Sequence, residues 1–219
     1  IIFIIIHYTG MKKESEAIKR LCDYKSKVSS HYFIKNNGQV LNLVPDLYKA
    51  WHAGISGWKK LKSLNDYSIG IEINNPGHEY GYRKFYAQQI QSLIKLLRFL
   101  KNKYNIKKQN ILGHSDISPN RKQDPGEKFP WNKLAKKNLC NWHNLNVNII
   151  KKYKNSKIKK NEEKIFFNNL YKIGYSRVVN LKIKKIDLIK AFQRRFRSNL
   201  VNGKVDQECL LISRNLIKN

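Results

Sequence analysis

Three residues with metal-ligating side chains stand where predicted strands end: His7, His114 and Asp124. Loops at strand ends are where a rigid scaffold usually presents functional groups. A catalytic zinc ion typically takes three nitrogen or oxygen ligands from the protein and leaves a fourth position for water. Two histidines and one carboxylate meet that requirement. Their separation along the chain is long, so spacing alone does not distinguish a metal site from hydrogen-bonded structural histidines.

A candidate acid–base group lies on the strand predicted over 68–74. Isoleucines at 69, 71 and 73 alternate there with a polar set that includes Glu72. Alternate residues of a strand face opposite sides of a sheet, so Glu72 lies on a polar face suited to a cleft floor. A salt bridge on the strand surface is the alternative role. Three other histidines are interpreted as turn, surface or packing residues: His31, His78 and His143.

The pattern along residues 1–145 indicates strands mixed with helices, an α/β arrangement. The first strand is the apolar run Ile1–Ile6, and Asn36-Asn37-Gly38 joins two further strands as a hairpin turn. Apolar residues recur at helical spacing over Phe85–Tyr104. The predicted strands are 1–6, 31–34, 39–44, 68–74 and 110–113, the predicted helices are 12–24, 85–104 and one after Trp131, and 115–130 is predicted to be a loop.

The last third of the chain has a different composition. Residues 151–160 (KKYKNSKIKK) form a basic, polar stretch that is typical of a linker or a solvated helix end. Three short helices are predicted after it, near 162–174, 186–196 and 206–217. Phe192 and Phe196 are expected in the core of this unit, and the neighbouring arginines are expected to be exposed cations: Arg194, Arg195 and Arg197.

The net charge of +29, from 44 Lys+Arg against 15 Asp+Glu, raises the question of a nucleic-acid partner. Clustered cations bind phosphates by releasing counterions. Here the excess is mostly Lys scattered over the whole chain, which a compositional bias explains as well as a polyanion partner does. We therefore expect no nucleic acid, although tight and steeply salt-dependent binding of DNA or RNA is the prediction of that alternative.

Neither a membrane span nor a disulfide framework is indicated. No apolar run approaches the ~20 residues of a membrane-spanning helix. The three cysteines are odd in number and contain no CxxC pair, which also argues against a thiolate zinc site. The chain begins without Met and enters a strand at once, so we expect a fragment or a mature form. The lack of a signal peptide is then uninformative about export.

The run GHSDISPNRKQDPG from Gly113 to Gly126, followed by Phe129-Pro130-Trp131, resembles the zinc-site loop of the type 2 N-acetylmuramoyl-L-alanine amidases, and within them the AmiD-like branch. Each segment alone is weak, but five occur in family order, which makes the match over about 1–145 highly specific. The other four are IHYT at 6–9, SSHYFI at 29–34, AWHAG at 50–54 and SIGIE at 68–72.

The resemblance implies that His7, His114 and Asp124 hold Zn²⁺ and that Glu72 and Lys122 are the catalytic pair. It implies hydrolysis of the amide between N-acetylmuramic acid and L-alanine in peptidoglycan or muropeptides. Zinc would polarise the carbonyl and lower the pKa of its water toward ~7. Glu72 would take the proton of that water and pass it to the leaving amine. Zinc is expected to dissociate in acid as the histidines are protonated.

Three more residues are candidates for work beside the metal. His52 is expected to line the cleft and touch substrate, with core packing against Trp51 as the alternative. Arg121 and Asp116 are candidates for groups that orient the ligands. Arg121 is alternatively a binding group for a carboxylate of the stem peptide. Lys122 is expected to stabilise the oxyanion of the tetrahedral intermediate.

The tail resembles the three-helix peptidoglycan-binding domain, chiefly through AFQRRF at 191–196 and Gly203-Lys204-Val205-Asp206. The alternative is a helical bundle that packs on the catalytic domain and binds nothing. We therefore expect a zinc amidase catalytic domain over 1–145, a basic linker over 146–161 and a peptidoglycan-binding-like helical domain over 162–219. The implied fold is a mixed central β-sheet flanked by helices, followed by the small bundle.

Two further questions stay open at this stage. The same family includes peptidoglycan-recognition proteins that bind without cutting, having lost a ligand, and the complete residue set argues against that alternative. A wall-binding module is useful only where the polymer exists, so we expect an exported or periplasmic enzyme. A cytoplasmic recycling amidase is the alternative location.

Overall fold

The protein is represented by a computed structural model that describes residues 1–176 and 183–218, so 177–182 and 219 of the predicted C-terminal domain lie outside the described residues. Its strands are β1 (Phe3–Tyr8), β2 (Tyr32–Ile34), β3 (Val40–Asn42), β4 (Gly57–Trp58), β5 (Leu61–Lys62), β6 (Ser68–Ile73) and β7 (Ile111–Gly113). Its helices are α1 (Glu14–Cys22), α2 (Ala87–Lys103), α3 (His114–Ile117), α4 (Trp131–Ala135), α5 (Val147–Lys152), α6 (Lys160–Ile173), α7 (Lys185–Phe196) and α8 (Gln207–Leu216). None of the helices in these described ranges is long and apolar enough to span a membrane.

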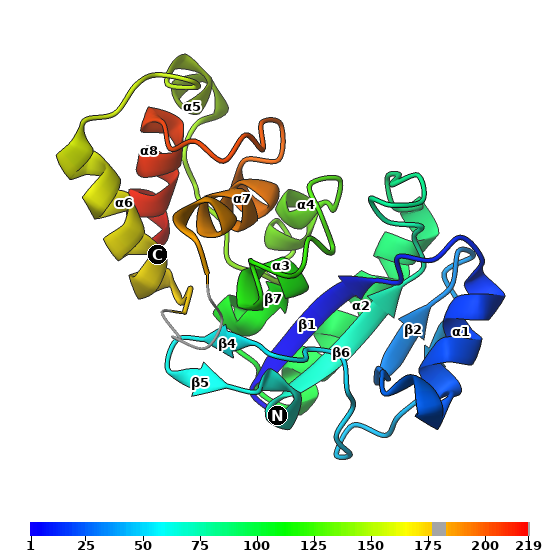
Figure 1. The fold of residues 1–219 in the computed structure, drawn as a ribbon. Coiled ribbons are helices and arrows are strands. Elements are labelled where there is room, and N and C mark those ends of the chain that lie inside the picture. Colours follow the sequence, from blue (N-terminus) through cyan, green and yellow to red (C-terminus); the bar gives the residue numbers. More distant parts are fainter. Residues whose placement is uncertain (177–182, 219) are drawn as a thin grey trace.

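A five-stranded mixed sheet forms the centre of the molecule (Figure 1). Its strand order is β3-β2-β6-β1-β7, and β1 lies between β6 and β7 with both neighbours parallel. Strand β2 pairs parallel with β6, and the predicted hairpin places β3 antiparallel to β2 at the edge. The α/β expectation and the hairpin are thereby confirmed.

The two faces of the sheet bury two different cores. On one face Ile69, Ile71 and Ile73 of β6 pack with the apolar stripe of α2. On the other face Phe3 and Ile5 of β1 pack with residues of α6, α7 and α8. Period-two alternation therefore places His7 on the same face as Phe3 and Ile5, beyond the part of that face that the C-terminal helices cover.

The C-terminal helices meet the first part of the chain through more than apolar contacts. Trp58 of β4 forms an antiparallel bridge with Tyr175, just after α6, and the two rings pack edge to face at 5.0 Å. The backbone N–H of Lys59 donates to Gly174 O at 2.6 Å. A Cβ at Gly174 would lie 2.4 Å from the Trp58 ring, so the close approach needs glycine. The predicted division at 145 and 162 stays a prediction.

Several local expectations differ from the structure. Strand β1 is shifted by two residues and includes His7, because its pairing with β6 continues to Tyr8. The β4–β5 hairpin was not foreseen, and the predicted loop 115–130 opens with the helical turn α3, in which the Asp116 carboxylate accepts from Gly113 N–H. Helix α5 lies inside the predicted linker.

The expectation that the three arginines of the tail are exposed was wrong, because Arg194 is half-buried and the other two are buried. Arg195 and Arg197 are 3% and 4% exposed, and each forms a buried ion pair, with Asp116 and Asp206 respectively. A buried guanidinium requires such a partner. Asp116 lies 79 residues before Arg195, so the sequence around Arg195 does not reveal the pair. Phe192 and Phe196 lie in the core as predicted.

Candidate metal centre

The parallel pairing of the central strands explains why distant residues meet. In the register of β1 with β6, His7 lies directly opposite Glu72. In the register of β1 with β7, Ile6 lies opposite Gly113, so His114 follows at the same end of the sheet. Strands that run the same way end at the same edge, and all three side chains are therefore delivered to one place.

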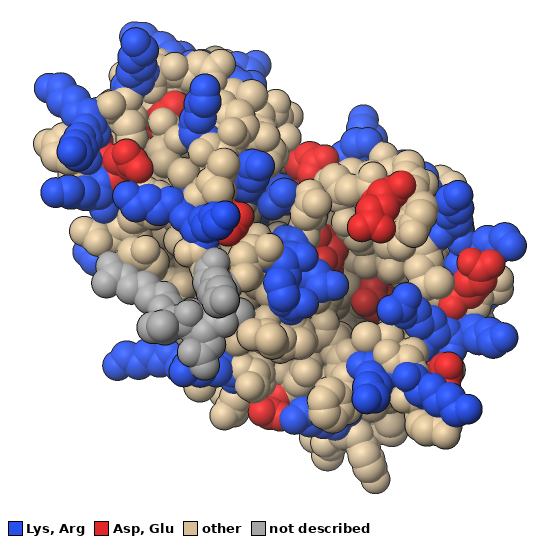
Figure 2. Space-filling view, viewed as in Figure 1, with Lys and Arg blue, Asp and Glu red and all other residues tan. Residues whose placement is uncertain are grey.

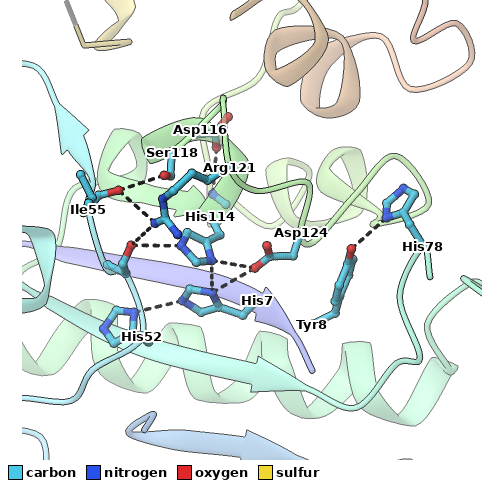
Figure 3. Close-up of polar contacts among 12 residues, drawn as sticks. His7, Tyr8, His52, Ile55, His78, His114, Asp116, Ser118, Arg121 and Asp124 are labelled. Carbon is cyan, nitrogen blue, oxygen red and sulfur yellow. Dashed lines mark hydrogen bonds and ion pairs between the residues drawn. The ribbon is translucent and has the colours of Figure 1, made fainter. Parts of the chain in front are cut away.

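Three ligand-type atoms form a nearly equilateral triangle at this edge (Figure 3). The Nδ1 atoms of His7 and His114 are 2.9 Å apart, and each is 3.0 Å from Oδ2 of Asp124. All three side chains are buried. Within the described residues this is the group of three that is placed to hold a metal ion.

Hydrogen bonds on the far side of the imidazoles fix which nitrogen faces the centre. Nε2 of His114 is 3.1 Å from Ala53 O, and a carbonyl only accepts, so that nitrogen carries the proton. Nε2 of His7 donates to Nδ1 of His52 at 3.0 Å. The neutral imidazoles therefore both turn a lone pair, on Nδ1, toward the Asp124 carboxylate.

The His7 bond is supported by a further relay. His52 Nε2 lies 3.4 Å from the Ser68 hydroxyl, which in turn donates to Leu64 O at 2.6 Å. Because the Ser68 hydroxyl uses its proton on Leu64 O, its oxygen accepts from Nε2 of His52. Nδ1 of His52 then carries no proton and accepts the hydrogen bond from His7. A Cβ at position 70 would lie 2.4 Å from the His52 ring, so Gly70 makes room for it.

The pKa shifts match this donor set. Burial, and then the neighbouring His114, lowers the pKa of His7 to about 4, so its imidazole is neutral at pH 7. Burial alone would raise the pKa of the Asp124 carboxyl, but His114 and His7 outweigh it and hold that pKa well below its usual range. A neutral imidazole at His7 and an ionised carboxylate at Asp124 are the protonation states that a divalent cation requires of such ligands.

Glu72 stands beside this centre as a different kind of carboxylate. Burial, and then the charge of Asp124, raises its pKa to about 8, while Lys122 acts in the opposite direction. Its Oε2 atom is buried and has no hydrogen-bond partner among the described residues. A carboxyl group whose pKa lies near neutral pH and whose second oxygen has no hydrogen-bond partner is suited to proton transfer.

One pocket brings together the predicted metal ligands, the predicted catalytic pair and the predicted substrate-binding residues, whereas Asp116 is buried outside its lining. Its lining includes His7, His52, Glu72, His114, Arg121, Lys122 and Asp124. On the face shown in Figure 2, acidic side chains lie within a hollow right of the centre, and basic side chains surround it. The same view shows Lys and Arg spread over the face and interspersed with acidic groups, with no continuous basic stripe.

Two of these residues, Arg121 and His52, form contacts with the groups around the metal ligands as well as lining the pocket. Arg121 Nη2 donates to Ala53 O at 3.1 Å and to Ile55 O at 3.0 Å, so it shares the Ala53 carbonyl with His114. His52 is 9% exposed and stands behind His7. Both side chains are thus placed to orient ligands as well as to line the pocket.

The sequence interpretation missed a second polar cluster in the pocket wall. The Tyr8 hydroxyl is 2.8 Å from Nδ1 of His78, whose Nε2 is 3.0 Å from the Glu127 carboxylate. The His78 ring also stacks on Tyr82 at 4.3 Å. The position of Tyr8 directly after His7 could have marked it as a pocket residue. His78 and Glu127 are 49 residues apart, so no local sequence pattern connects them.

Comparisons with known proteins agree with the site. The family model described as N-acetylmuramoyl-L-alanine amidase matches residues 1–127. The chain is 34% identical to the N-acetylmuramoyl-L-alanine amidase AmiD of Escherichia coli (strain K12), over 98% of this chain and 82% of that protein.

Two solved structures are similar over the whole chain. One is E. coli AmiD in complex with the substrate anhydro-N-acetylmuramic acid-L-Ala-D-gamma-Glu-L-Lys, with a TM-score of 0.85, 33% identity and coverage of 100% of this chain and 89% of that one. The other is AmpDh3 from Pseudomonas aeruginosa in complex with anhydromuramic pentapeptide, with a TM-score of 0.85, 27% identity and coverage of 100% and 91%.

Proposed function

The chain belongs to the N-acetylmuramoyl-L-alanine amidase family and is a hydrolase of peptidoglycan or muropeptides, and we propose that it works with one zinc ion held by His7, His114 and Asp124. The observation that carries this proposal is the triangle of two inward Nδ1 lone pairs and one carboxylate oxygen, with sides of 2.9 and 3.0 Å. Two imidazole nitrogens and one carboxylate oxygen are a donor set that catalytic zinc sites use, with the fourth position left to water or substrate.

A zinc ion held by these three residues would act as a Lewis acid, which would polarise the scissile carbonyl and make water a stronger acid. Glu72 takes the proton of the attacking water, because its carboxyl lines the pocket beside the three ligands and its Oε2 atom has no hydrogen-bond partner among the described residues. The same carboxyl then returns the proton to the leaving amine of L-alanine.

Lys122 is proposed as the second catalytic residue. Its side chain lines the pocket together with Glu72, and its charge acts on both Glu72 and His7. A fixed cation beside the scissile carbonyl stabilises the oxyanion that forms in the transition state, an effect worth about 3 kcal/mol per donor in other hydrolases. Arg121 and His52 are proposed to contact the substrate from the part of each side chain that lines the pocket.

The experiment is product analysis on two substrates. Zinc-loaded protein is incubated with intact peptidoglycan and, separately, with anhydro-muropeptides of the kind bound in the AmiD and AmpDh3 structures. Mass spectrometry should detect released peptides with a free L-alanine amino terminus. Full zinc loading without such release from either substrate would contradict the proposed function, and loading with a stoichiometry far below one would contradict the proposed ligands.

We also propose that residues 162–219 bind peptidoglycan and that the protein works in the periplasm or outside the cell. Both proposals follow from the resemblance of the tail to a wall-binding module. In a sedimentation assay, the chain with Glu72→Gln should co-pellet with insoluble peptidoglycan, since it is expected to bind without cutting. Protein that stays in the supernatant would contradict the first proposal, and recovery with the cytoplasmic fraction after osmotic shock would contradict the second.

A further inference from the structure

Arg195 connects helix α7 to the strand that leads into the metal centre. Its side chain is almost fully buried, and Nη1 donates to Oδ2 of Asp116. Nη2 donates to Ile111 O on β7 at 3.1 Å. The guanidinium also lies over the ring of Trp131, 4.2 Å from its centre. Arg195 belongs to a C-terminal helix, but all three of these contacts are with residues among the first 145 of the chain.

Asp116 is the residue through which this contact reaches a metal ligand. It is 1% exposed and lies in α3, two residues after His114 (Figure 3). Besides Arg195, it accepts hydrogen bonds from Gly113 N–H at 2.8 Å and from the Tyr175 hydroxyl at 2.9 Å. The carboxylate therefore closes the turn that begins with His114, and two of its donors come from beyond residue 160.

The same turn is also in contact with the loop of the third ligand. A Cβ at Gly113 would lie 2.7 Å from Pro125, the residue after Asp124, and 3.2 Å from the Trp131 ring. The backbone N–H of Ser115 donates to Asp124 O at 2.9 Å. Because these segments are in close contact, a displacement of the turn would move both His114 and Asp124.

We propose that Arg195 is a positioning residue of the metal centre, through which α7 holds the turn that carries His114. This inference rests on the proposed zinc site. Removing the guanidinium leaves the Asp116 carboxylate buried beside fewer donors, and a buried charge without its partner must move, bind water or take up a proton. Each of these outcomes loosens the hold on Gly113. Groups that orient metal ligands typically change metal affinity roughly 10–100-fold when they are removed.

Arg197 offers a matched control two residues further along. It is also almost fully buried and also donates to a buried carboxylate, that of Asp206. Its other described partners are Asn202 and Glu208, both in the C-terminal part of the chain. Loss of Arg197 therefore damages the helical unit to a comparable degree while leaving the contact with the His114 turn in place.

The test compares the zinc dissociation constants of Arg195→Met, Arg195→Lys and Arg197→Met with that of the wild type. The constants are measured by competition with a chelating dye, at a temperature at which circular dichroism shows that all four proteins are folded. The Met side chains keep most of the buried volume. We expect Arg195→Met to weaken zinc binding roughly 10–100-fold. Arg195→Lys, which keeps the charge but not the two-pronged contact, should lie between it and the wild type. Arg197→Met should stay within about twofold of the wild type.

Equal zinc affinities for Arg195→Met and the wild type would overturn the proposal, as would an equal loss in Arg197→Met. If Arg195→Met does not fold, Arg195→Lys decides in the same way. At saturating zinc, the substrate KM of Arg195→Lys should be unchanged while kcat falls, since the altered group touches the metal turn and not the substrate. A wild-type chain that binds no zinc would overturn the proposed zinc site itself, and this inference with it.

Discussion

Acidification of the metal-free protein should destabilise the fold through His7 in a window between pH 6.5 and pH 4. In the folded chain burial and the nearby His114 lower the pKa of this imidazole from 6.5 to about 4. The unfolded chain therefore binds a proton in that window that the folded chain does not bind. Stability rises with pH wherever the unfolded state holds more protons, so it falls as the pH is lowered through the window.

The size of the effect follows from the two pKa values. Each unit of pKa difference corresponds to about 1.4 kcal/mol, so the full shift of His7 amounts to roughly 3 kcal/mol once the pH is well below 4. Between pH 7.5 and 4.5 the linkage relation gives a loss of about 2–3 kcal/mol in the free energy of unfolding. That is a large share of the ~5–15 kcal/mol by which domains are normally stable.

The assay is urea denaturation in the presence of a metal chelator at several pH values, for the wild type and for His7→Gln. The buried His31 and the half-buried His143 also have lowered pKa values and contribute to both proteins. The difference between the two curves isolates His7. The free energies of unfolding of the wild type and the variant should converge by about 2–3 kcal/mol as the pH falls from 7.5 to 4.5. Parallel curves would refute the argument that His7 is buried in its neutral form.

Three substitutions test the roles of other groups at the centre. Glu72→Gln should lower kcat by roughly 10²–10⁴-fold while zinc content by atomic absorption stays at one per chain, and retained turnover would exclude Glu72 as the base. Lys122→Met should lower kcat by roughly 10²–10³-fold with little change in KM, whereas a change confined to KM would assign it to ground-state binding. Gly70→Ala should weaken zinc binding roughly 10–100-fold in a chelator competition, because the new Cβ displaces the His52 ring; an unchanged affinity would show that the His7–His52 contact does not orient the ligand.

Local pattern was sufficient for much of the central sheet. The alternation of isoleucines with polar residues in β6 predicted both its buried face and the cleft side of Glu72, because the core face of a strand is specified residue by residue. The Asn-Gly hairpin between β2 and β3 was equally local. The start of β1 was misplaced because apolar Ile1 and Ile2 satisfy the strand pattern, while pairing with β6 decides where the strand lies.

The metal centre was a different matter. Its ligands were assigned by resemblance to a family, since residues more than 100 positions apart carry no spacing signal. Arg121 and Asp116 were named beforehand as groups that orient the ligands, but two further supporting groups could not be found from the sequence. Ala53 O is a backbone atom, and Arg195 follows another arginine on a helix that pattern alone places in a separate unit. Tertiary partners that come from another layer of the fold become visible only when the layers are assembled.

The sheet face that carries the proposed zinc ligands is also the face against which α6, α7 and α8 are packed, and this arrangement limits how the chain can be shortened. Shortening the chain to its first 145 residues would expose Phe3, Ile5 and Leu112, which are now at most 2% accessible, as a contiguous apolar surface prone to aggregation. A chimeric lysin with altered wall targeting should therefore retain residues 1–218 intact and receive its new binding module as a fusion after them.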